Sequence, residues 1–202
     1  SLPSRGLGDV YKRQGEIQAA FRQGGLVLWT ATLAGGRPGQ SVATVEDIGA
    51  TPVISGRSVY AANTSGRIVA LNLDSGERLW SAPYGTRSLI WPAAGSVFFI
   101  NDLSEITRLD AKTGDFIWAV QLPGYLDKDS TRTKEIVAHH GPILAGGRLI
   151  VASSDGKLRQ FDPTSGNELL SIRIPGGATT APIVSDGTLY VVSKRGELHA
   201  FR

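Results

Sequence analysis

The fold is decided by a stretch that reads GRIVALNLDSGERLW from Gly66 to Trp80. The same frame returns from Ser104 to Trp118 and again from Gly156 to Leu170. A weaker copy covers residues 15–29, and a truncated copy covers residues 196–201. A repeat of this size determines the architecture before any single residue does, because each copy is one structural unit that packs on the next.

The spacing of the repeat predicts an all-β fold made of four-stranded propeller blades. Its turn glycines recur at the separation of roughly 40–50 residues that is typical of such blades. They are Gly25, Gly76, Gly114 and Gly166. Each unit is expected to contain a proline-led strand, an almost continuously apolar strand, a strand at the start of the frame and a strand that carries tryptophan. Strands of the second kind are covered on both faces.

Each marked residue of the frame has a mechanical reason. Glycine at the turn adopts positive φ, which a hairpin with a bulge requires. Asp110 and Asp162 precede turns and are expected to accept hydrogen bonds from the turn amides. Trp29, Trp80 and Trp118 stand four residues after the glycine, where a large ring is expected to wedge against the next blade.

Composition limits the class of protein. The chain has 202 residues with 25 glycines and 10 prolines, which is typical of a turn-rich β protein. It has no cysteine, so disulfides, thiolate nucleophiles and zinc–cysteine sites are excluded. No apolar run reaches the ~18 residues of a membrane span. The formal charge of +3 includes the basic residues of segment 1–14, so it does not predict a nucleic-acid partner.

The repeat also sets the expected domain boundaries. Residues 1–14 fit no copy and are interpreted as a non-native tail, and 15–202 as a partial propeller, about half of an eight-bladed ring. The expected divisions are residues 15–33 for the last two strands of a blade, 34–82, 83–122 and 123–174 for complete blades, and 175–202 for three strands of the last blade.

The frame resembles the PQQ-like propeller repeat, and the chain is similar to the C-terminal half of the BamB family of outer-membrane assembly lipoproteins. Two features carry this closer resemblance. The linker Val45–Pro52 resembles an acidic segment of that family that precedes a Thr-Pro strand, and the short unit around Trp91–Asn101 has a counterpart of similar size.

The resemblance implies a non-enzymatic scaffold at the periplasmic face of the outer membrane of a Gram-negative bacterium. It implies binding to the periplasmic domains of BamA and to unfolded outer-membrane β-barrel proteins, with membrane attachment only through a lipid anchor that this chain lacks. Asp47 falls on the first contact aspartate of the family, with Glu46 beside it, whereas Gly49 replaces the second. No catalytic residue, metal site or cofactor is predicted.

Other interpretations remain open. The PQQ-like repeat also occurs in PQQ-dependent dehydrogenases, and a sensor or interaction propeller is a further alternative. The adjacent His139 and His140 alternate faces on a strand, so they are interpreted as structural and not as metal ligands. The charged segment 127–135 is interpreted as a solvated loop. Free blade edges are expected to accept an extended strand of another protein.

Overall fold

The computed structural model describes residues 7–12, 15–33, 48–125 and 135–202, and every regular element among them is a β-strand. These residues contain no helix long and apolar enough to cross a membrane. The chain forms two compact units. The first contains residues 1–87 and the turn Ala111–Asp115, and the second contains Ser88–Asp110 and Phe116–Arg202.

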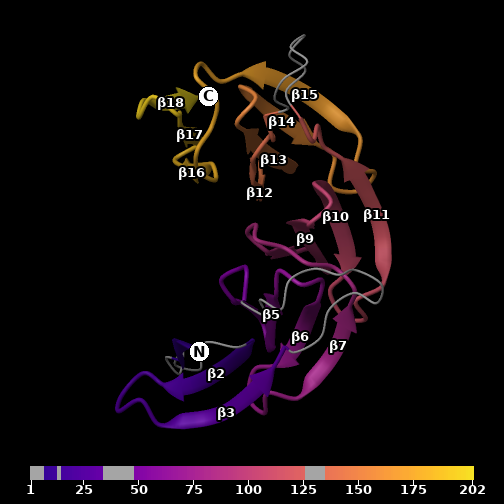
Figure 1. Cartoon of the computed structure of the whole chain (residues 1–202), viewed down its shortest axis with the longest axis vertical. Helices are drawn as coiled ribbons and strands as arrows, with labels where there is room; N and C mark the ends of the chain where they lie inside the picture. The colour runs from indigo at the N-terminus through magenta and orange to yellow at the C-terminus, as the bar shows by residue number, and fades with distance from the viewer. Residues whose placement is uncertain (1–6, 13–14, 34–47, 126–134) are drawn as a thin grey trace. The chain divides into compact units, whose positions relative to one another are not determined.

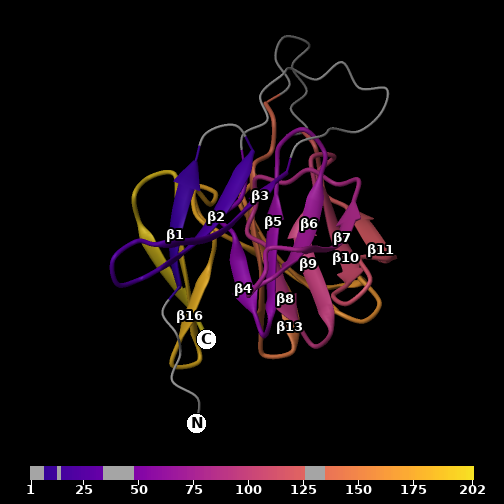
Figure 2. The ribbon, with the colours of Figure 1, turned by 90° about the horizontal axis from the view of Figure 1, so that it is seen from below.

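The strands form five antiparallel sheets, and strands that follow one another in the chain lie side by side (Figures 1 and 2). The first sheet has three strands, β1 (Leu7–Lys12), β2 (Glu16–Phe21) and β3 (Val27–Thr32). The second has β4 (Val53–Ser55), β5 (Ser58–Ala62), β6 (Ile68–Asn72) and β7 (Arg78–Ala82). The third has β8 (Trp91–Ala93), β9 (Ser96–Ile100), β10 (Glu105–Asp110) and β11 (Phe116–Gln121). The fourth has β12 (His139–Ala145), β13 (Arg148–Ser153), β14 (Lys157–Phe161) and β15 (Glu168–Arg173), and the fifth has β16 (Ile183–Ser185), β17 (Thr188–Val192) and β18 (Leu198–Phe201).

The second strand of each complete sheet is buried on both faces. All five residues of β9 are buried, as are the last four of β5 and the last five of β13. The side chains of β13 alternate between two apolar clusters, because the third and fifth sheets each contribute to one of them. One cluster joins β9 and β10 to β13 and β14, and another joins β13 and β14 to β17. Burial on two faces explains why these segments are apolar without alternation.

The first sheet differs from the expected domain boundaries. Leu7–Lys12 lies in the segment interpreted as a tail outside the fold, yet it forms β1 and pairs antiparallel with β2 from Leu7↔Phe21 to Lys12↔Glu16. The expectation that only two strands precede residue 34 is therefore wrong. The physical reason is that pairing of a strand edge uses backbone groups, which any extended segment carries, whether or not it fits the repeat.

The turn between the third and fourth strands has the expected hairpin geometry. Gly76, Gly114 and Gly166 have φ between 72° and 77°, and the strand register shifts just before each turn, as in a β-bulge. The carboxylate of Asp162 accepts hydrogen bonds from the Ser165 and Thr164 amides, at 2.8 Å each, and these bonds lower its pKa from the ordinary value.

The tryptophans of the frame pack on the turn of the following sheet. A Cβ added to Gly76 would lie 2.6 Å from the ring of Trp29, and one added to Gly114 would lie 2.6 Å from the ring of Trp80. The third pair is alike, with Trp118 against Gly166 at 3.0 Å. The glycines therefore leave room for the rings, in addition to adopting positive φ.

The third tryptophan makes a different polar contact. Trp29 Nε1 donates to Leu73 O at 2.9 Å and Trp80 Nε1 to Ala111 O at 3.0 Å. The corresponding carbonyl oxygen, of Pro163, instead accepts from Arg108 Nη1 at 3.1 Å. Trp118 Nε1 is buried without a hydrogen-bond partner in the described part of the chain. Arg108 occupies the position that Ala70 has in the second sheet. Its guanidinium binds the carbonyl oxygen that corresponds to the acceptor of the tryptophan Nε1 in the two preceding contacts.

Candidate interaction surface

The predicted contact residues Glu46 and Asp47 lie outside the described residues, but the chain that follows them is firmly anchored. Ile48 forms an antiparallel bridge with Asn63, and Gly49 N donates to Ala62 O at 3.1 Å. Asn63 is fully buried, and its Nδ2 donates to Leu33 O at 3.1 Å. The acidic segment is therefore attached at its C-terminal end to the end of β5.

Gly49 is the position at which the resemblance has a second aspartate. A Cβ at Gly49 would lie 2.5 Å from the Thr86 carbonyl oxygen and 2.6 Å from Thr64 Cγ2. Contacts this short require the backbone to shift, so no side chain fits here without rearrangement. The glycine thus has a local packing reason, and an acid at this position is incompatible with the packing observed.

A buried polar residue follows the second strand of the second, third and fifth sheets, and its side chain binds amides of the next turn. Asn63 Oδ1 accepts from Arg67 N at 2.8 Å, and Asn101 Oδ1 accepts from Leu103 N and Glu105 N at 2.9 and 3.0 Å. Ser193 Oγ accepts from two turn amides at 3.3 Å. These residues were not predicted from the sequence, although it carries a signal for them, since one polar residue ends each apolar run.

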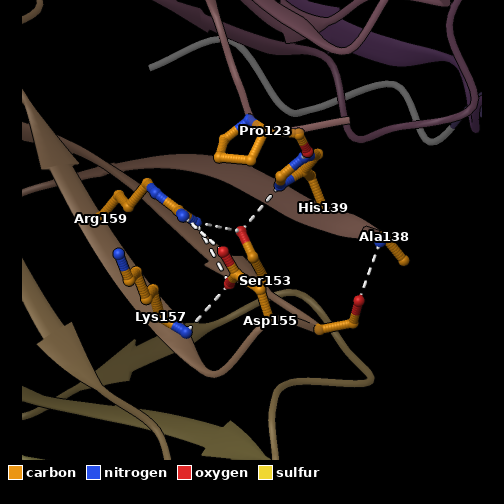
Figure 3. Close-up of polar contacts among 8 residues, drawn as sticks. Pro123, Ala138, His139, Ser153, Asp155, Lys157 and Arg159 are labelled. Carbon is orange, nitrogen blue, oxygen red and sulfur yellow. Dashed lines mark hydrogen bonds and ion pairs between the residues drawn. The ribbon is translucent and has the colours of Figure 1, made fainter. Parts of the chain in front are cut away.

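In the fourth sheet this position belongs to a larger polar network (Figure 3). Arg159 Nη1 donates to Ser153 Oγ at 3.0 Å, and the Arg159 guanidinium forms an ion pair with Asp155. The two charged side chains are only 5% and 10% exposed. On the other side, Ser153 Oγ lies 2.7 Å from His139 Nδ1, and His139 Nε2 lies 3.0 Å from Pro123 O.

The network fixes the proton positions on His139. A carbonyl oxygen only accepts, so Nε2 carries the proton that is donated to Pro123 O, and Nδ1 accepts from the Ser153 hydroxyl. Burial lowers the pKa of His139, and the nearby Arg159 charge lowers it further, so the imidazole is neutral. Ser153 is fully buried and already bonded on both sides, so the pair is not arranged for nucleophilic attack.

Acidification is predicted to destabilise the folded chain through these histidines. Burial lowers the pKa of both His139 and His140 from the ordinary value of 6.5. As the pH falls through that value, the unfolded chain binds protons that the folded chain does not, so the free energy of unfolding decreases. The decrease ends once the pH is below the folded-state pKa values. Urea unfolding between about pH 7.5 and pH 5.5 measures it, above the range in which carboxylates titrate.

The variant His139→Gln/His140→Gln tests the origin of this slope. Glutamine does not titrate, so the variant is expected to have a flatter dependence of the free energy of unfolding on pH. An equal slope in both proteins would assign the pH dependence to other groups.

The structure also places the remaining sequence-derived candidates. Within residues 7–12, 15–33, 48–125 and 135–202, there is no group of three or more side chains suited to hold a metal ion. Of the charged segment 127–135, only Glu135 is described, and it forms an ion pair of 3.3 Å with Lys194. The capping role expected of Asp110 stays a prediction.

The outer strands expose one large apolar residue at the same place in four sheets. It precedes the tryptophan position of the frame, and its exposed fraction lies between 41% and 52%. The residues are Leu28, Leu79, Ile117 and Leu169. Strands β7, β11 and β15 each form the edge of a sheet and lack a second strand partner among the described elements. Apolar side chains on an open edge are suited to pairing with an extended strand.

Comparison with known proteins identifies what this chain is similar to. A family model described as outer membrane protein assembly factor BamB matches residues 7–120 and 127–202. The outer membrane protein assembly factor BamB of Legionella pneumophila is 26% identical over 185 residues, which cover 92% of this chain and 45% of the relative. The chain thus spans about half the length of the curated relatives that it matches.

Solved structures show the same fold. The crystal structure of BamB from Moraxella catarrhalis matches with a TM-score of 0.73 at 19% identity, over 99% of this chain and 55% of the other. Quinohemoprotein alcohol dehydrogenase from Comamonas testosteroni matches with a TM-score of 0.68 at 12% identity, over 98% and 40%. These likenesses confirm the all-β fold with four-stranded antiparallel propeller blades, about half of a ring.

Proposed function

Because the chain belongs to the family of the outer membrane protein assembly factor BamB, we propose that it serves as a non-enzymatic scaffold in the assembly of outer-membrane β-barrel proteins. Its place is the periplasmic face of the outer membrane, and its partner is BamA. The observation that carries the proposal is the family match over nearly all of the chain. The likeness to a dehydrogenase is a likeness of fold alone and favours no reaction.

The proposed contact with BamA is the acidic segment that ends at Ile48. Glu46 and Asp47 directly precede Ile48, which pairs with Asn63 just after β5. Charged groups at the rim of an interface steer association and select the partner. A basic surface on the partner is the complementary chemistry.

Charge reversal at Asp47 tests the proposal. The protein with Asp47→Arg is expected to bind the periplasmic domains of BamA about tenfold more weakly, because a favourable charge contact becomes repulsive. Titration calorimetry or a pull-down measures the loss. Glu77→Arg is a matched control, because Glu77 is an exposed acid at a turn of the same compact unit. Equal binding by all three proteins would contradict the contact, and no binding by any of them would contradict the BamA partner.

A second proposed activity is the holding of extended barrel segments along the outer strands. The support is the exposed apolar residue on each of the edge strands β7, β11 and β15. A barrel-derived peptide that pairs with such an edge is expected to slow hydrogen exchange of the edge amides. Unchanged exchange along all three strands, with peptide in excess, would count against this activity.

A further inference from the structure

Two cations face each other across strands β14 and β15. Lys157 and Arg173 are direct partners in the antiparallel register, so their side chains lie on the same face of the sheet. Both are exposed, and neither has a carboxylate partner among the described residues. Like charges directly opposite each other destabilise a strand pair. The pair therefore calls for an explanation other than the stability of the sheet.

The same position carries an acid in the first and third sheets, whereas the frame of the second sheet has Arg67 there. The third sheet has Glu105 opposite Gln121, and the first sheet has Glu16 opposite Thr32. Among the pairs that the structure describes at this position, only the fourth sheet has two cations in place of an acid and a neutral polar residue. The repeat does not require this charge, so it is a feature of this blade.

The nearest acid does not neutralise the pair. Asp155 binds the buried guanidinium of Arg159 and accepts from the backbone amide of Lys157 at 3.1 Å. Figure 3 shows the Lys157 side chain extending away from Asp155, which contacts Lys157 only through that amide. The face that carries Lys157, Arg159 and Arg173 has three cations and two carboxylates: Asp155 is engaged by Arg159, and Glu168 lies at the opposite end of β15 from Arg173.

Lys157 lines two hollows, and Arg173 lines one of them. One has a volume of about 620 Å³ and is lined by residues that include Lys157, Ser171, Arg173 and the Gly176–Gly177 turn. The other has about 380 Å³ and lies between the end of β11 and the face of β14 and β15. Lys157 and Ser171 line both, so the hollows meet there. We call the combined depression the Lys157 groove.

Strand β15, which contributes Ser171 to both hollows, is an open edge of its sheet. Within the described chain β15 pairs only with β14, and five of its six residues are exposed. Its outer backbone groups are therefore available for a further strand. A small anion would use the two charges but not this edge, whereas an extended polypeptide would use both.

We propose that the Lys157 groove binds an extended, acidic segment of another polypeptide. The segment pairs with the free edge of β15, and its carboxylates lie against Lys157 and Arg173. The backbone pairing supplies affinity, and the two cations select acidic over basic sequences. This site is separate from the Asp47 contact and does not depend on BamA being the partner of that contact.

The test uses the full chain and two labelled peptides of about ten residues. One alternates threonine with glutamate, and the other alternates threonine with lysine. Fluorescence anisotropy is expected to show binding of the acidic peptide only, weakening as salt rises from about 50 to 300 mM. Lys157→Glu/Arg173→Glu is expected to weaken the acidic peptide about tenfold and to bind the basic peptide instead. This exchange of preference is a readout that loss of folding does not produce.

The control is Arg22→Glu/Arg87→Glu, which changes the net charge equally at two exposed arginines of the other compact unit. It is expected to bind the acidic peptide like the parent. Equal binding of both peptides to the parent, or equal losses in the two double variants, would overturn the proposal. Competition by inorganic phosphate at matched ionic strength would assign the site to a small anion, and binding only to vesicles that contain anionic lipid would assign it to a membrane. Either result would also overturn the proposal.

Discussion

The protein with Trp80→Ala is expected to have a free energy of unfolding about 3–5 kcal/mol below that of the parent. The ring is 7% exposed and packs on Gly114, and its centroid lies 6.0 Å from that of Tyr60. Alanine would leave a cavity where the ring stood and would also leave Ala111 O without the Nε1 donor at 3.0 Å. Urea unfolding followed by far-ultraviolet circular dichroism measures the change, in the transition of the first compact unit.

Leu79→Ala is the matched control, because Leu79 precedes Trp80 on the same strand and is 49% exposed. Its loss is expected to stay near or below about 1 kcal/mol, since half of that side chain is already in water. Trp118→Ala separates ring packing from hydrogen bonding, because Trp118 Nε1 makes no hydrogen bond that would be lost. Equal effects at positions 79 and 80 would show that the contact with the following turn contributes little.

The second large effect is expected at the buried ion pair. Asp155→Ala leaves the Arg159 guanidinium, whose side chain is 5% exposed, without its counter-charge. Removing one partner of a buried pair typically costs about 3–5 kcal/mol, because the remaining charge stays desolvated. The same denaturation experiment measures this loss in the second compact unit.

Two variants separate this mechanism from general disruption. In Asp155→Ala/Arg159→Met no charge remains buried, so much of the lost stability is expected to return. Asp74→Ala breaks the exposed ion pair with Arg57, whose side chains are 61% and 80% exposed, and is expected to cost about 1 kcal/mol or less. A double variant as unstable as Asp155→Ala alone would rule out the unpaired charge as the cause.

The sequence predicts the blades well because strand order and turns depend on local patterns. The fully apolar runs of β5, β9 and β13 indicate burial on two faces, and the turn glycines indicate positive φ. Both depend on residues close together in the chain. The structure agrees at these elements because each local preference matches the environment that the neighbouring sheets supply.

The polar network of the fourth sheet was not predictable in the same way. Arg159 and Asp155 are ordinary surface residue types, and only the packed structure shows that the pair is buried. The role of Ser153 depends on His139 and Pro123, which precede it by 14 and 30 positions in the chain. Contacts between distant positions leave no periodic signal. The pairing of Leu7–Lys12 with β2 was missed because backbone pairing requires no recognisable motif.

The contact between each tryptophan and the following turn has a consequence for how such a chain grows. Trp29, Trp80 and Trp118 each belong to one repeat and rest on the glycine of its successor. A tandem duplication of the coding segment for one repeat therefore copies both halves of the contact. The new glycine receives the ring of the repeat before it, and the new tryptophan meets the glycine after it. Gene duplication can thus change the number of blades without a new junction having to evolve.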